Sequence, residues 1–201
     1  MTNVLFAATS YPRSQTDWQG IFIKRIADAL ADDPAINVRL WAPEGPRHPR
    51  VESAITAGDA RFLSGLATEG GIAHLLRNDL PRALLRGASL TTRLHATYRR
   101  NQEWAGIFHL NWLQCALGHI GLRGALLVTV LGSDLALLQR PGMVTALKLA
   151  FRGKRVVLCP NAEWMVPELS NKLGDACTEV TCVPFGAGHS WSRTEPRPSP
   201  P

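Results

Sequence analysis

Residues 125–138, with the sequence ALLVTVLGSDLALL, constrain the fold more than any other stretch of this chain. Their first half is an unbroken apolar run rich in β-branched residues, which indicates a strand buried on both faces. Strands of this kind belong to parallel sheets that are covered by helices. We therefore expect an α/β fold built on a parallel sheet with helices on both faces.

Ser133 and Asp134 follow this strand directly and are the first candidates for a functional site. Open α/β folds bind ligands just beyond the carboxyl ends of their central strands. Both residue types also cap helices, because their side-chain oxygens accept hydrogen bonds from free backbone N–H groups. The sequence supports a helix cap and a binding site equally at these two positions.

Length and charge set further bounds. A chain of 201 residues can form one domain with a hydrophobic core and is marginal for two. No apolar run reaches the roughly 20 residues of a membrane span. The amino terminus has no signal-peptide pattern, so we expect a cytoplasmic protein. The net charge of +6 favours anionic partners such as nucleotide diphosphates, nucleic acid or an anionic membrane surface.

The four cysteines, Cys115, Cys159, Cys177 and Cys182, have neither the Cys-x-x-Cys spacing of a metal site nor the density of a disulfide-rich domain. Cys159 and Cys182 fall inside apolar runs, where free cysteine behaves as a small hydrophobic residue. We expect no bound metal ion and no disulfide bond.

The order of the elements predicts one Rossmann-like domain over residues 1–186. Strand patterns over 3–9 and 36–42 enclose a helix and form a right-handed βαβ unit. The expected apolar stripe of this helix is Phe22, Ile26, Ala29 and Leu30, and its expected N-cap is Thr16 or Asp17. A tail over 187–201, rich in Pro, Ser and Arg, is typical of a linker or a disordered end.

The rest of the domain continues the alternation of strands and helices. Further strands are expected near 51–55, 106–110, 125–130, 155–159 and 179–183. Further helices are expected near 74–76, over 81–100 and 113–120, and around 143–151 and 166–173.

Gly20, His109 and Asn111 are the remaining candidates for a site. Gly20 precedes the first helix, where a glycine lets a ligand phosphate approach backbone N–H groups. Neither G-x-G-x-x-G nor a P-loop occurs, so a plain turn is the other interpretation. His109 and Asn111 share one face near the carboxyl end of a strand. A lone histidine there is more often structural, whereas two polar side chains together favour a site.

The helix over 81–100 is predicted to be amphipathic and basic. Its apolar side would carry Leu84, Leu90, Leu94 and Tyr98, and its opposite side would carry Arg82, Arg86, Arg93 and Arg100. A basic face is commonly a solvated outer surface. The alternative is contact with an anionic acceptor or with lipids of the inner membrane leaflet.

Several motifs, taken in order, resemble the amino-terminal domain of family-4-like glycosyltransferases with the GT-B fold. The motifs are Tyr11-Pro12, Gly20-Ile21-Phe22, Leu30, Val38, Pro43, His109-Leu110-Asn111-Trp112, Gly132-Ser133-Asp134, Asn161, Met165, Leu169 and Val183-Pro184-Phe185-Gly186. The resemblance covers roughly residues 3–186. It implies a retaining enzyme built from two Rossmann-like domains that face a cleft, of which this chain would be one half.

The resemblance also implies roles. The amino-terminal domain holds a glycan or lipid-linked acceptor of polysaccharide assembly, and the other domain holds the nucleotide-sugar. Gly20 would approach the donor diphosphate, and His109, Asn111, Ser133 and Asp134 would line the acceptor side. Of these, Asp134 and His109 would orient or deprotonate the acceptor hydroxyl. No metal, no cofactor beyond the nucleotide-sugar substrate and no nucleic-acid partner is implied.

The chain departs from this family at Gln19, Asn111 and Leu131, where many relatives have glycine, histidine and histidine. The domain that binds the donor is missing from these 201 residues. We therefore expect a truncated protein with little or no transfer activity by itself. The alternative is a non-catalytic binding module that shares this common fold. A nucleotide-dependent oxidoreductase is disfavoured because the glycine fingerprint is missing.

Overall fold

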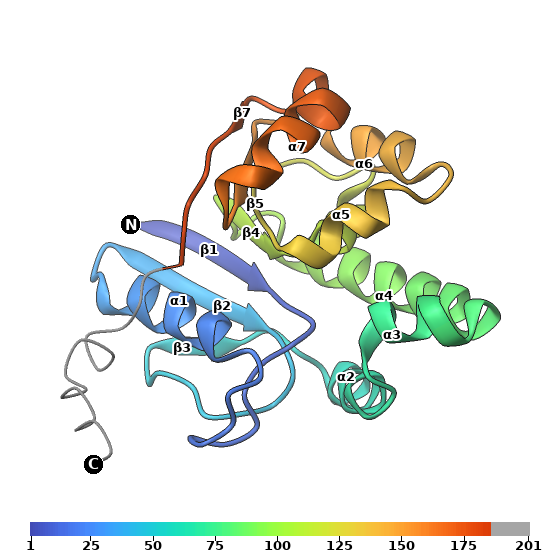
Figure 1. Cartoon of the computed structure of the whole chain (residues 1–201). Helices are drawn as coiled ribbons and strands as arrows, with labels where there is room; N and C mark the ends of the chain where they lie inside the picture. Colours follow the sequence, from blue (N-terminus) through green and yellow to red (C-terminus); the bar gives the residue numbers. More distant parts are fainter. Residues whose placement is uncertain (186–201) are drawn as a thin grey trace, which may run out of the picture.

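The structure is a computed structural model that describes residues 1–185 (Figure 1). Within these residues, seven parallel strands form one sheet in the order β3-β2-β1-β4-β5-β6-β7. The strands are β1 (Thr2–Ala7), β2 (Ile36–Trp41), β3 (Val51–Ser53), β4 (Ile107–Asn111), β5 (Ala125–Val130), β6 (Val156–Pro160) and β7 (Glu179–Val180). The predicted Rossmann-like parallel sheet is confirmed. The linker predicted over 187–201 lies outside the described residues.

The α-helices of the described chain are α1 (Ile21–Asp32), α2 (Ala57–Thr68), α3 (Gly71–Asn78), α4 (Leu80–Asn101), α5 (Gly132–Leu138), α6 (Met143–Phe151) and α7 (Val166–Leu173). Short 3₁₀ helices are η1 (Leu113–His119), η2 (Glu163–Met165) and η3 (Gly174–Ala176). Most of the predicted elements are confirmed, but α2 was not anticipated. The predicted helix over 113–120 is a 3₁₀ helix.

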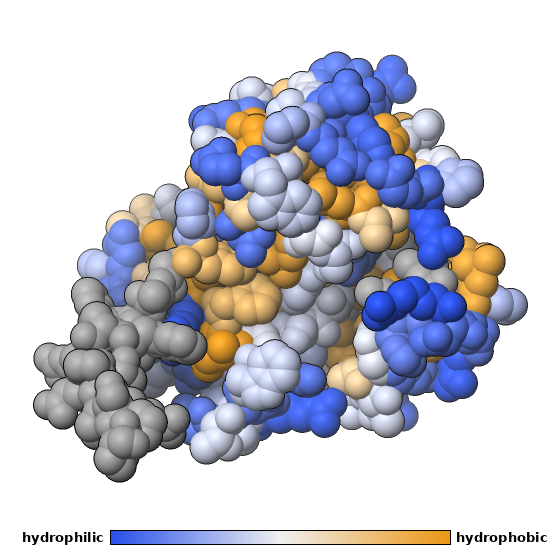
Figure 2. All heavy atoms as spheres, in the orientation of Figure 1, coloured by the Kyte–Doolittle hydropathy of each residue, from blue (hydrophilic) through white to orange (hydrophobic). Residues whose placement is uncertain are grey.

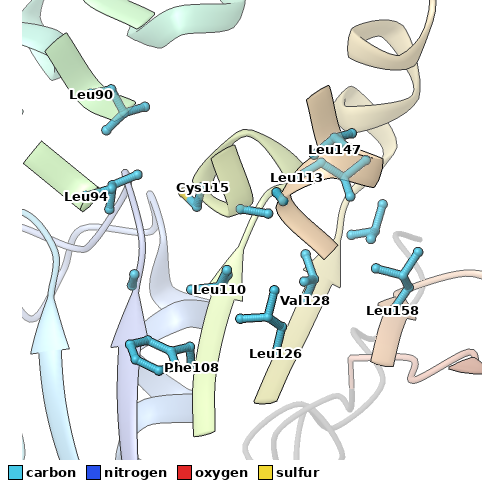
Figure 3. Close-up of a cluster of buried hydrophobic side chains, with 14 of the residues drawn as sticks. Leu90, Leu94, Phe108, Leu110, Leu113, Cys115, Leu126, Val128, Leu147 and Leu158 are labelled. Atoms are coloured by element: carbon cyan, nitrogen blue, oxygen red, sulfur yellow. The ribbon is translucent and has the colours of Figure 1, made fainter. Parts of the chain in front are cut away.

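Helices cover the two faces of the sheet unequally. On one face, α1 packs its buried side chains Ile23, Ala27 and Ala31 against Phe6 and Leu40. On the other face, α4, η1, α6 and α7 contribute to a larger core over β4, β5 and β6. Figure 3 shows part of this core, with Leu90 and Leu94 of α4, Leu113 and Cys115 of η1, and Leu147 of α6 gathered above Phe108, Leu110, Leu126, Val128 and Leu158 of the strands. The prediction of helices on both faces is confirmed.

The apolar run of β5 is buried on both faces of the sheet, but not equally. Leu126, Val128 and Val130 point into the larger core, and each such side chain contributes about 1.5–3 kcal/mol when fully buried. On the opposite side of the strand Thr129 is buried, whereas Leu127 is half-buried. The strand is therefore packed more tightly on one face than on the other.

Helix α1 corrects two expectations about its sequence. Phe22, Ile26 and Leu30 of the predicted stripe are partly buried and pack against the core, but Ala29 is exposed. The fully buried residues are Ile23, Ala27 and Ala31. The N-cap is Gly20 rather than Thr16 or Asp17, and no side chain caps the helix. The carboxylate of Asp17 accepts backbone N–H groups of the preceding loop instead, from Arg13 at 2.9 Å and Gln19 at 2.9 Å. The loop therefore has its own hydrogen bonds, and the helix starts after it.

Helix α4 corrects a third expectation. Leu90, Leu94 and Tyr98 enter the core as predicted, but Leu84 is 64% exposed and Ala83 is buried in its place. The reason is the unanticipated helix α2, which lies beside α4 and takes up the arginine side. No helix among residues 1–185 combines the length and the apolar character needed to cross a membrane.

Candidate functional site

The chain reverses its direction of travel across the sheet between β1 and β4. These strands are neighbours, but β1 leads on to β2 and β4 leads on to β5, so the loops after them diverge. Such a topological switch point leaves a crevice at the carboxyl ends of the strands. A cavity of about 660 Å³ opens there, lined among others by Tyr11, Gly20, Trp112, Ser133 and Asp134. We call this cavity the switch cleft.

Gly20 lines the switch cleft, and two physical reasons require a glycine at this position. Its φ of 71° is in the left-handed region, which glycine adopts without a Cβ clash. A Cβ on Gly20 would also stand 2.8 Å from the backbone nitrogen of Tyr11 and 2.9 Å from Oγ of Ser10. The loop after β1 therefore folds back tightly onto the start of α1. Because of this close approach, a residue with a Cβ would fit here only if neighbouring atoms shifted.

Trp112 stands at the end of β4 in a strained conformation. Its φ of 71° makes it the one residue other than glycine with a positive φ among residues 1–185. Such a conformation costs on the order of 1–3 kcal/mol and tends to occur at functional sites. The backbone N–H of Trp112 donates to the carbonyl of Thr129 at 3.0 Å. The indole lies half-buried beside Phe22, with ring centroids 6.2 Å apart, and faces the cleft.

Asp134 holds this strained turn in place. Its Oδ1 accepts the backbone N–H of Leu113 at 3.1 Å, and its Oδ2 accepts that of Leu131 at 2.7 Å. Burial raises the pKa of Asp134 to about 7, against the two N–H donors, which lower it. The side chain is 2% exposed although it borders the cleft. Asp134 is the third residue of α5 and accepts the N–H of Leu131, which precedes the helix, so it stabilises the helix start as the first alternative expected. It also borders the cleft, and a role in ligand binding stays a prediction.

His109 and Asn111 share one face of β4, as expected, but neither lines the switch cleft. Nε2 of His109 lies 2.8 Å from Oγ1 of Thr129, and its ring packs edge-on against Phe6. Burial lowers the pKa of His109 to about 3, so the ring is neutral at physiological pH. Nδ2 of Asn111 donates to the carbonyl of Ala7 at 3.1 Å and joins the ends of β4 and β1. The two residues form part of the sheet beneath the cleft.

The structure therefore brings Gly20, Ser133 and Asp134 to one cavity and leaves His109 and Asn111 outside it. Ser133 is exposed and Asp134 is engaged with backbone groups. Three arginines that were not expected from the sequence also line the cleft, Arg13, Arg77 and Arg140. They are far apart in the chain and carry no common motif. The strain at Trp112 likewise has no signature in the sequence.

The described residues contain no group of three or more His, Cys, Asp or Glu side chains that could hold a metal ion. Cys115 and Cys159 are buried free thiols, and burial raises the pKa of Cys115 above the range in which it would ionise. The switch cleft thus offers arginine, hydroxyl and aromatic side chains. These groups suit a polar ligand with an anionic part.

No protein-family model matches this sequence, and no curated protein matches it either.

Proposed function

We propose that this domain is the acceptor-binding half of a retaining glycosyltransferase of the GT-B type. The observation that carries the proposal is the switch cleft, an open cavity at the carboxyl edge of an all-parallel sheet, between the Gly20 turn and the start of α5. Ligands of open α/β folds bind at this place. Three residues of the motifs that resemble the family, Gly20, Trp112 and Ser133, border this cavity.

The lining of the cleft suits a sugar-containing acceptor. Trp18 and Trp112 offer flat aromatic surfaces, and Ser133 offers a hydroxyl group for hydrogen bonds. Arg13 and Arg140 favour a phosphate or carboxylate on the ligand, because guanidinium groups bind both in a bidentate way. A glycan or lipid-linked acceptor with an anionic group fits these features.

Transfer itself would need a nucleotide-sugar held by a second lobe across the cleft. In that complex the donor diphosphate would lie against the Gly20 turn, and Ser133 would contact the acceptor. Asp134 would act by fixing Trp112 and the start of α5, since both of its oxygens already accept backbone N–H groups. We expect the 201-residue chain to bind acceptor analogues but to transfer little or no sugar by itself.

A titration of the purified chain tests the proposal. We expect glucose 1-phosphate at millimolar concentration to raise the melting temperature and to quench tryptophan fluorescence, whereas glucose gives a smaller effect and NAD⁺ gives none. The variant Trp112→Ala should lose the response, and the control Trp164→Ala, altered at an exposed tryptophan outside the cleft, should keep it. A response to NAD⁺ but not to the sugar phosphate would support the oxidoreductase instead.

A non-catalytic binding module is the second candidate, and one observation favours it. His109 lies outside the cleft and Asp134 is committed to backbone N–H groups, so neither is placed to act as a base on a bound hydroxyl. The two candidates differ in the presence of a donor-binding lobe. Sugar transfer by this domain joined to such a lobe would decide for the enzyme, and binding without transfer would decide for the module.

A further inference from the structure

The outward side of α4 is apolar over its first turns. Leu80, Pro81, Leu84, Leu85 and Ala88 fall within an arc of about 140° at 100° per residue, and all five are exposed. Leu80 is 50% exposed, Leu84 64% and Leu85 72%. We call these five residues the leucine face.

A single exposed leucine needs no explanation, but a cluster does. Three of the eight large hydrophobic side chains that are exposed in the described part of the chain lie between positions 80 and 85. The helix cannot turn them inward, because Ala83, Leu90 and Leu94 already fill the core from its other side. The leucine face is therefore a fixed apolar surface of the folded domain.

The surroundings of the leucine face are strongly basic. Residues 69–101 contain six arginines and two acidic residues, Glu69 and Asp79. Arg77 is exposed in the last turn of α3, three residues before the leucine face begins in the sequence, and the side chain of Arg82 is 53% exposed although it also pairs with Glu69. Figure 2 shows hydrophobic and strongly hydrophilic surface side by side at the right-hand end of the molecule, where α4 begins in Figure 1.

The size and shape of this surface point to one kind of partner. Five side chains on one convex helix offer on the order of a few hundred Å², whereas a stable protein interface needs roughly 800 Å² from each partner. A lipid bilayer sets no such threshold, because leucines enter the headgroup region one by one while arginines attract anionic lipids. We propose that the leucine face and its flanking arginines dock this domain on the surface of an anionic membrane.

The proposed membrane contact is the leucine face of α4, whereas the sequence suggested the arginine side of this helix. Arg86 and Arg93 are turned toward α2, where they pair with Glu69 and Asp59. Arg82 also pairs with Glu69, but its side chain is 53% exposed, against 31% for Arg86 and 34% for Arg93, so it contributes more to the contact. Docking through the leucine face would bring Arg77 to the lipid surface. Because Arg77 also lines the switch cleft, a lipid-linked molecule would reach the cavity from the membrane.

Vesicle sedimentation of the full 201-residue chain tests the inference without any sugar substrate. We expect binding to vesicles of phosphatidylcholine with 30% phosphatidylglycerol, weaker binding to pure phosphatidylcholine, and loss of binding at high salt. Leu84→Gln with Leu85→Gln keeps the net charge and should lower the partition coefficient by about tenfold or more. Leu149→Gln, at an exposed leucine of α6, is the matched control and should bind as the wild type does.

The same variants also provide the folding control and the results that would contradict membrane docking. Because Leu84 and Leu85 are exposed, the double variant should keep the circular dichroism spectrum of the wild type, and Leu85→Gln alone serves if it does not. Equal vesicle binding by wild type and variants, or no binding by the wild type, would overturn the inference. So would dimerisation in sedimentation velocity that the double variant abolishes, since that result would assign the leucine face to a second copy of the chain.

Discussion

At the scale of single residues, Gly20 shows how closely the loop after β1 approaches α1. Gly20→Ala should destabilise the fold by about 3 kcal/mol, because the Cβ meets both the left-handed backbone cost and the nitrogen of Tyr11 at 2.8 Å. Gly153→Ala is the matched control, since Gly153 has the same φ of 71° but nothing within 4 Å of its Cβ position. It should lose only about 1 kcal/mol. Urea denaturation measures both, and equal losses would contradict the steric part.

Asp134 is a second residue whose role the structure defines. Asp134→Ala leaves the buried N–H group of Leu113 and the partly buried N–H group of Leu131 without acceptors and should cost about 2–4 kcal/mol. The strained turn at Trp112 should also relax, which would raise the hydrogen-exchange rate at Leu113. Ser133→Ala alters the exposed neighbour and should change stability by less than about 0.5 kcal/mol. If Asp134→Ala lowers the unfolding free energy by much less than about 2 kcal/mol, other contacts hold the turn.

At the scale of elements, the pairing of α2 with α4 decides which side of α4 meets solvent. Asp59 is the third residue of α2 and forms a capping box with the N-cap Thr56, and its Oδ1 also accepts from Nη1 of Arg93 on α4 at 3.3 Å. Hydrogen bonds from Thr56 and Arg93 keep the pKa of Asp59 below its usual value although burial opposes them. The Asp59 carboxylate thus stabilises the start of α2 and also links α2 to α4.

Replacing Asp59 should loosen this pair of helices. Asp59→Ala should cost about 1–2 kcal/mol from the lost cap alone, and it should speed hydrogen exchange in α2 more than in β4 or β5. Asp175→Ala removes an exposed partner of Lys148 and should leave the melting temperature unchanged. Uniform exchange rates across the protein in Asp59→Ala would mean that α2 does not open separately.

At the scale of the whole molecule, buried histidines make stability depend on pH. His119 lies between Tyr98 and Phe108, and burial, with help from Lys154 and His95, lowers its pKa to about 4. Because the unfolded chain binds this proton near pH 6.5 and the folded chain does not, stability is lost as the pH falls from 6.5 toward 4.

The variant His119→Phe removes this proton and keeps an aromatic ring in the core. Between pH 7 and pH 4.5 its unfolding free energy should fall by about 2 kcal/mol less than that of the wild type. Guanidinium denaturation at the two pH values measures the difference. A variant with the same pH dependence as the wild type would assign the acid sensitivity to other groups, of which His109 is the first candidate because its pKa is also lowered, to about 3.

The sequence by itself determined the fold class and the edge of the sheet at which a ligand could bind. The apolar run of β5 and the alternation of strands and helices require a parallel sheet, and a parallel sheet brings the carboxyl ends of its strands together. That is why Gly20, Ser133 and Asp134 could be grouped before the structure, since each follows or faces a strand end. These features depend on local patterns in the sequence, which do not change with the way distant elements pack.

Only the tertiary structure decided which polar groups reach the cavity and which surfaces stay exposed. His109 and Asn111 share one face of β4 as expected, but that face is buried, and His109 packs against Thr129 and Phe6. Leu84 fits a core pattern, yet the contacts of α4 with α2 and the sheet turn it to solvent. Burial depends on which distant elements pack together, and periodicity along one helix or strand does not contain that information.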